Sequence, residues 1–185
     1  MYVFCLQIWV RRPRGKKYEY FPEYCHRYKH HTDKINIIGF ISSTGVGRIE
    51  LFEENMNAKL LKKLLTNNVV ASAKKLFGEN YHNWWFLHDN DKKFTSGLVS
   101  KWCFDNGIHC LDFPPYSPDL NPIEHIWVDL KKAVEKRNPQ SLSDLKTIIP
   151  EEWEKLPSSK CANYIGSMKR RCLSVIANKG YRTKY

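Results

Sequence analysis

The chain of 185 residues has no Cys-x-x-Cys pair, although six cysteines are spread along it. The paired spacing that is typical of structural zinc sites is therefore missing. No apolar run reaches the roughly 18 residues that a membrane-spanning helix needs. In the first segment the basic residues follow the apolar ones, whereas a signal peptide has the opposite order. We expect neither a zinc domain nor a membrane partner.

Acidic residues are also scarce, with 19 Asp and Glu against 30 Lys and Arg, so that the formal net charge is +11. A surface with this excess attracts polyanions, nucleic acid first and anionic membrane second. Hydrophobic residues make up 42% of the chain and aromatic residues 14%. This composition is typical of a folded globular protein and unlike that of a disordered one.

Apolar patterns along the chain alternate between the two-residue period of strands and the three- to four-residue period of helices. Short strands followed by helices predict an α/β sheet with helices on both faces. Open sheets of this kind bind ligands at the carboxyl ends of their strands. The patterns predict strands at 3–10, 34–42, 48–52, 84–88 and 108–111, and helices at 57–77, 96–105, 122–137, 141–156 and 158–178.

The first candidate site residue is Asp89, which directly follows the apolar stretch 84–88. A carboxylate at the end of a buried strand projects from a rigid edge and suits a hard cation. The alternative is a purely structural role, since Asp and Asn often end strands by hydrogen bonding to the local backbone.

The second candidate is Glu124, which lies in the proline-rich stretch 114–127. A structural interpretation is available here too. Asn121 can cap a helix, Pro122 suits its first position, and Glu124 can complete a capping box. Capping alone does not require four prolines in the lead-in loop, so the rigid backbone indicates that the start of this helix is being positioned.

Together these stretches resemble the mariner-type DDE transposases. The segment 114–127 is similar to that family's Pro-Pro-x-Ser-Pro-Asp-Leu-Asn-Pro-Ile-Glu-x-x-Trp signature, and Asp89-Asn90 resembles its Asp-Asn motif. In one subgroup 34 residues separate the two acids, as they separate Asp89 from Glu124 here. A long motif combined with a matching spacing is a specific signal. Lys92 and Phe94 depart from the family, which often has Pro and His there.

The resemblance implies a ribonuclease-H-like α/β fold, a mixed sheet flanked by helices, truncated at its first strand. It implies one incomplete catalytic domain over residues 1–185, with a helical C-terminal part over about 122–185. The intact family cuts and joins transposon DNA with two Mg²⁺ or Mn²⁺ ions, and Asp89 and Glu124 would be the catalytic, metal-binding residues. The resemblance further predicts that DNA is the partner, that the protein forms a homodimer and that it is located in the nucleus. It predicts no small-molecule substrate.

In the family, the first aspartate lies on the first strand. When the family's separation between its first and second aspartates is counted back from Asp89, the position falls before residue 1 of this chain. The amino-terminal modules that read transposon ends are likewise not in this sequence. With two carboxylates, at most one ion would bind weakly, and we expect little strand cleavage by the chain alone. A central position of the sheet would also lack its strand. The alternative function is that of a recruited, non-catalytic nucleic-acid-binding protein.

Two basic clusters are candidate DNA contacts, because phosphate binding by Lys and Arg needs no sequence specificity. The resemblance places the first in a turn near the active face. For the second cluster, a solvated surface is an equally weighted alternative. The first cluster is Arg11, Arg12, Arg14, Lys16 and Lys17, and the second is Lys169, Arg170 and Arg171. Trp127 and Trp153, in contrast, are predicted to be core residues because of their helical context.

Overall fold

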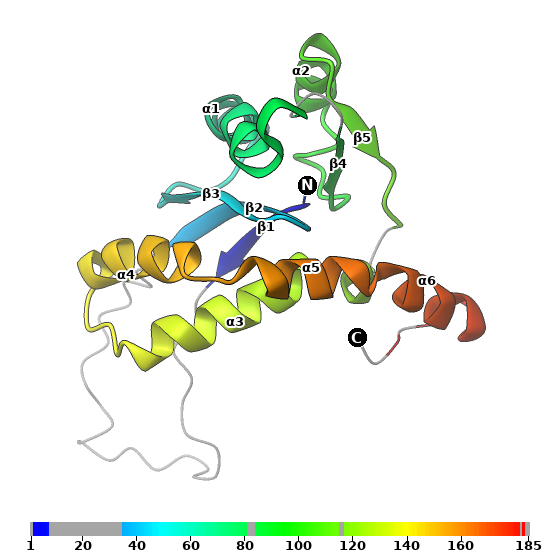
Figure 1. Ribbon diagram of the computed structural model, residues 1–185. Coiled ribbons are helices and arrows are strands. Elements are labelled where there is room, and N and C mark those ends of the chain that lie inside the picture. The colour runs from blue at the N-terminus through cyan, green and yellow to red at the C-terminus, as the bar shows by residue number, and fades with distance from the viewer. Residues whose placement is uncertain (1, 8–34, 81–83, 115–116, 182, 184–185) are drawn as a thin grey trace, which may run out of the picture.

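The computed structural model describes residues 2–7, 35–80, 84–114, 117–181 and 183, and its centre is a mixed five-stranded sheet (Figure 1). The strand order is β3-β2-β1-β4-β5. The first three strands of the chain pair antiparallel, whereas β4 runs parallel to both β1 and β5. The strands are β1 (Tyr2–Gln7), β2 (Asn36–Ser42), β3 (Gly45–Phe52), β4 (Trp85–His88) and β5 (His109–Leu111).

The centre of the sheet is filled by β1, which lies between β2 and β4. The expectation that a central position would lack its strand is therefore wrong. Tyr2 and Val3 are in register with Leu87 and His88 of β4. This pairing places the carboxyl end of β4 beside the start of β1, the central strand of the sheet.

Helices cover both faces of the sheet (Figure 1). On one face lie α1 (Ala58–Phe77), the short helix η1 (Gly78–Asn80) and α2 (Gly97–Asp105), and on the other lie α3 (Ile123–Lys136), α4 (Leu142–Glu154) and α5 (Ser158–Gly166). The three-layer α/β arrangement predicted from the sequence is confirmed. Within the described ranges, no helix combines the length and apolar character that crossing a membrane requires.

Strand β2 shows why the sheet needs helices on both sides. Ile38 and Phe40 belong to the core formed with α1 and α2. Ile37 and Ile41 belong to the opposite core, formed with α3, α4 and α5. Successive side chains of a strand point to opposite faces, so a continuous apolar run indicates a strand buried on both.

Gly39 is the residue of β2 on which α3 and α4 converge. Trp127 of α3 and Trp153 of α4 stack on each other with ring centroids 5.2 Å apart, and both are almost fully buried. A methyl group on Gly39 would lie 2.8 Å from the ring of Trp127 and 3.0 Å from that of Trp153. The Trp153 indole nitrogen donates a 2.9 Å hydrogen bond to the carbonyl of Gly47. The predicted core role of both tryptophans is confirmed.

The last predicted helix, 158–178, is two helices in the structure: α5 is followed by α6 (Met168–Ala177), and Ser167 lies between them. Gly166, a weak helix former, ends α5. The Ser167 hydroxyl donates a 2.6 Å hydrogen bond to the carbonyl of Tyr164, the kind of local bond by which serine competes with regular helix. The helical periodicity of the sequence does not reveal such a bond.

We predict that Gly39→Ala destabilises the protein by about 1–3 kcal/mol, because the added methyl group has to displace two packed indole rings. Urea unfolding followed by tryptophan fluorescence measures the change. Gly97→Ala is the matched control, since a methyl group there meets no atom within 4 Å. Equal stability of Gly39→Ala and Gly97→Ala would contradict the tight packing at Gly39.

Candidate functional site

Asp89 directly follows β4 and lies at the carboxyl end of this strand, as the sequence predicts. Its side chain is half-buried, and its Oδ1 atom is buried without a hydrogen-bond partner among the described residues. An unpaired carboxylate oxygen in such a position is costly unless another group compensates it. The Asp89 carboxylate does accept a local hydrogen bond from the backbone N–H of Asp91, as the structural alternative expects, but this bond leaves Oδ1 without a partner among the described residues.

The loop after Asp89 is held by its neighbours. The ring of His88 stacks on Phe94, with centroids 4.9 Å apart, and its Nδ1 lies 2.6 Å from the carbonyl of Asp89. The Asn90 amide donates to the carbonyl of Phe113, which joins this loop to the segment after β5. Phe94, one of the departures from the family pattern, thus has a defined packing role.

Glu124 lies in the first turn of α3 and is half-buried. The capping box predicted as its alternative role is not formed: Pro122 occupies the N-cap position, and no side chain caps this helix. The sequence predicts Asn121 as the cap, but its Oδ1 is buried without a partner in the described part of the chain. The bonds of Asn121 at this helix start come from its backbone: its carbonyl accepts the Glu124 N–H at 3.3 Å, and its N–H donates to the carbonyl of Pro118 at 3.0 Å. The carboxylate of Glu124 therefore remains available.

Asp89 and Glu124 interact electrostatically across the site. Burial raises the pKa of Glu124, and the nearby charge of Asp89 raises it further. Burial likewise raises the pKa of Asp89, and the charge of Asp91 adds to this rise. Asp91 itself is occupied by its own turn, because its carboxylate accepts the Lys93 backbone N–H at 2.8 Å. Two half-buried like charges repel each other, and a cation between them would relieve this repulsion.

These two acids fit a hard divalent cation. Mg²⁺ prefers oxygen ligands and commonly takes only one or two protein carboxylates, with water and phosphate as the remaining ligands. Asp89 would offer an oxygen without a hydrogen-bond partner in the described ranges, and Glu124 would offer a carboxylate at a helix N-terminus. Among the residues that the structure describes, no group of three or more His, Cys, Asp or Glu side chains could hold a metal ion. The sequence of β1, Tyr2–Gln7, contains no acidic residue.

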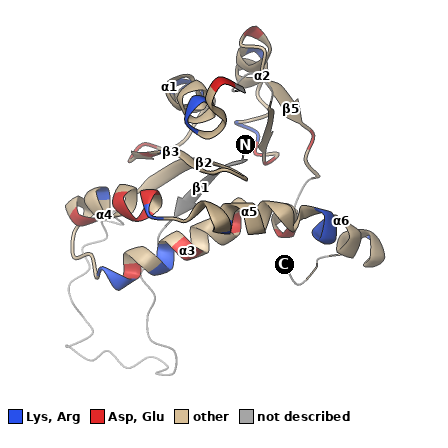
Figure 2. Ribbon diagram, viewed as in Figure 1, with Lys and Arg blue, Asp and Glu red and all other residues tan. Residues whose placement is uncertain are grey.

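The second basic cluster is only partly a surface feature. Lys169 and Arg170, near the start of α6, are exposed. Figure 2 shows a basic segment at this end of the helix. Arg171 is 2% exposed, so its prediction as a DNA contact is wrong. Its guanidinium group instead donates to the carbonyl of Asp119 at 2.8 Å and to the hydroxyl of Ser167 at 2.7 Å. The first cluster, Arg11, Arg12, Arg14, Lys16 and Lys17, lies outside the described residues and stays a prediction.

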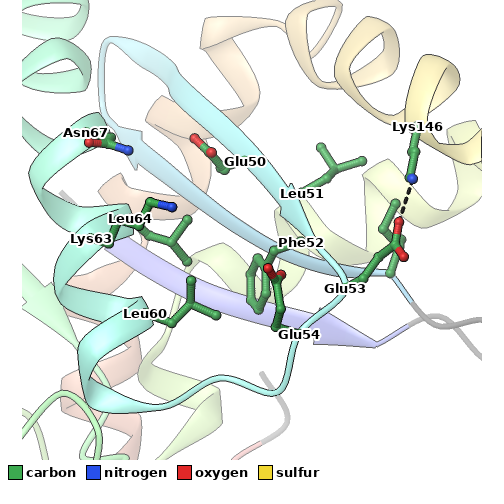
Figure 3. A pocket seen from close by; sticks show the side chains of 11 residues that line it. Glu50, Leu51, Phe52, Glu53, Glu54, Leu60, Lys63, Leu64, Asn67 and Lys146 are labelled. Atoms are coloured by element: carbon green, nitrogen blue, oxygen red, sulfur yellow. Dashed lines mark ion pairs between the residues drawn. The ribbon is translucent and has the colours of Figure 1, made fainter.

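A cavity of about 600 Å³ lies elsewhere, beside the edge strand β3 and the start of α1 (Figure 3). Several of its polar groups are engaged: Glu53 forms an ion pair with Lys146, and Glu50 accepts a hydrogen bond from Asn68. Since β3 is separated from β4 by two other strands, this cavity is distinct from the Asp89–Glu124 site.

Comparison with known families finds a match over residues 8–146 to the family described as DDE superfamily endonuclease. Among characterised proteins, the chain is 33% identical over 178 residues to the transposable element Tcb1 transposase of Caenorhabditis briggsae. This similarity covers 96% of the chain and 63% of that transposase. The chain thus spans less than two thirds of the length of this relative.

Solved structures with the same fold include the catalytic domain of Mos1 mariner transposase, with a TM-score of 0.77 at 21% identity. That similarity covers 99% of the chain and 84% of the Mos1 domain. For the Mos1 mariner paired end complex with Mn, the TM-score is 0.82 at 22% identity. This similarity covers 99% of the chain and 56% of the Mos1 chain. The ribonuclease-H-like fold class predicted from the sequence is confirmed.

The raised pKa values of Asp89 and Glu124 predict a dependence of stability on pH. An acid whose pKa is higher in the folded state than in the unfolded chain contributes stability while it is protonated. This contribution is lost as the pH rises above the pKa of the acid in the unfolded chain, about 4. We therefore expect Glu124→Gln and Asp89→Asn to raise the thermal midpoint at pH 7 without added metal. The gain should shrink toward pH 4. Melting curves at both pH values measure it, and lower midpoints at pH 7 would show that these charges are not in conflict.

Proposed function

The chain belongs to the DDE superfamily of endonucleases, and within it to the Tc1/mariner-type transposases, and we propose that it serves as their metal-dependent DNA-cutting and DNA-joining domain. The observation that supports this proposal is the electrostatic interaction of Glu124, in the first turn of α3, with Asp89, which directly follows β4. Because the chain spans only part of its relatives, transposition by the whole protein, nuclear localisation and a homodimer are parts of the same proposal.

The residues at the site support binding of Mg²⁺ or Mn²⁺ by Asp89 and Glu124. A divalent ion held there would activate a water or a 3′-hydroxyl group and stabilise the oxygen that leaves the phosphodiester. The protein's own contribution is to hold two oxygen ligands on rigid elements and to shield them partly from water. Two carboxylates support a single, weakly held ion, so we expect little cleavage from this 185-residue chain by itself.

DNA is the partner that the charge and the family favour. A net charge of +11 supports contacts with phosphate groups, and Lys169 and Arg170 are exposed on α6. A recruited, non-catalytic DNA-binding protein would need the same basic surface without the paired acids. The presence of both acids at the 34-residue spacing favours the transposase function over this alternative.

We predict that the chain binds Mn²⁺ and that Asp89→Asn and Glu124→Gln each weaken this binding at least about tenfold, because each removes one of the two charged ligands. Electron paramagnetic resonance of free Mn²⁺ during a titration measures the affinity. Asp91→Asn is the matched control, since this acid is paired with Lys93. Metal binding that survives the loss of both Asp89 and Glu124 would refute the proposed site.

We predict salt-dependent binding to double-stranded DNA that does not require a metal. Replacing Lys169 and Arg170 by Ala should reduce the slope of log affinity against log salt by about 0.9 for each phosphate group that the protein no longer neutralises. Fluorescence anisotropy with a labelled duplex at several salt concentrations gives this slope. Lys75→Ala on α1, where the lysine is paired with Glu154, is the control. An unchanged slope in the double variant would exclude α6 as a DNA-binding element.

A further inference from the structure

The turn before α3 is held by the C-terminal segment of the chain. This turn is the short helix η2 (Pro118–Leu120). Asp119 is only 5% exposed, and one of its carboxylate oxygens accepts two hydrogen bonds from Thr183. The Thr183 backbone N–H donates at 3.0 Å and its hydroxyl at 2.8 Å. Figure 1 shows the chain turning back after α6 toward the body of the molecule, which allows this contact.

Arg171 holds the same turn from α6. Its guanidinium group donates to the backbone carbonyl of Asp119 and also to the hydroxyl of Ser167 at the start of α6. Asp119 is thus bonded through its side chain to Thr183 and through its backbone to Arg171. These partners lie 64 and 52 residues further along the chain, so the contacts are tertiary and not part of a local turn motif.

Helix α3 needs such support because it does not cap itself. Helices α1, α2 and α4 each begin at a side chain that accepts a hydrogen bond from the first turn: Asn57, Ser96 and Ser141. At the start of α3, Pro122 has no side-chain acceptor. An uncapped first turn frays readily. Glu124 lies in this turn, two residues after Pro122, so its position depends on what holds the preceding η2.

We propose that Asp119, Arg171 and Thr183 form a C-terminal clamp that positions Glu124 toward Asp89. The inference rests on the proposed metal site, since positioning matters only where two ligands have to meet. A metal site requires its ligands to be held within a fraction of an ångström by neighbouring bonds. The clamp supplies these bonds from the C-terminal segment, without contributing a ligand itself.

Thr183→Val tests the clamp, because it removes the hydroxyl donor while retaining the backbone N–H and the size of the side chain. We expect Mn²⁺ affinity to fall about tenfold, the usual scale for the loss of a group that orients a ligand. Amide hydrogen exchange at Glu124 and His125 should become faster, since their N–H groups bond within the first turn. Thr183→Ser retains a hydroxyl donor and should restore both values.

Ser141→Ala is the control for general loss of stability, because it removes the side-chain cap of a different helix, α4. It should leave Mn²⁺ affinity and exchange in the first turn of α3 unchanged. Unchanged exchange in Thr183→Val, or an equal effect in Thr183→Ser, would overturn the clamp. Wild-type protein that binds no Mn²⁺ would refute the proposed function instead, and exchange at Glu124 would still decide whether the clamp holds α3.

Discussion

The packing of Trp127 and Trp153 over Gly39 determines where α3 lies on the sheet, and the site depends on this contact. Glu124 is three residues before Trp127, about one helical turn away. Once the indole ring is packed against Gly39, the first turn of α3, and Glu124 within it, has a fixed place relative to β2. A smaller ring or a larger residue at 39 would shift the helix, and with it the carboxylate.

The site itself works against the stability of the fold. Asp89 carries a buried oxygen with no partner among the described residues, and its charge opposes that of Glu124. Natural proteins keep such conflicts mainly where function requires them. The two apolar cores on either side of the sheet compensate for this local cost.

The sequence is informative where chemistry leaves a local pattern. The apolar run at 34–42 predicts a strand, which the structure shows as β2, and the 34-residue spacing, through the family resemblance, predicts which two acids form the site. Roles that depend on tertiary contacts leave no such pattern. Arg171 has the appearance of one of three consecutive basic surface residues, because burial of one member cannot be inferred from the run.

The same limit applies to Asn121 and Asp119. Asn121 has the residue type and position of a helix cap, yet its side-chain oxygen has no partner in the described part of the chain. In the sequence, Asp119 is only one member of a longer motif, and its bonds to Thr183 depend on a segment 64 residues away. Local propensity describes neighbours along the chain, whereas these positions are decided by neighbours in space.

The clamp also determines when during synthesis the site can be completed. A ribosome delivers the chain from its amino terminus, so the sheet and α3 have emerged before Thr183, which holds η2. Until this late segment docks, Glu124 belongs to an uncapped helix end. A premature stop codon in the last few positions of the reading frame would spare nearly all of the core and still leave the metal ligands unaligned.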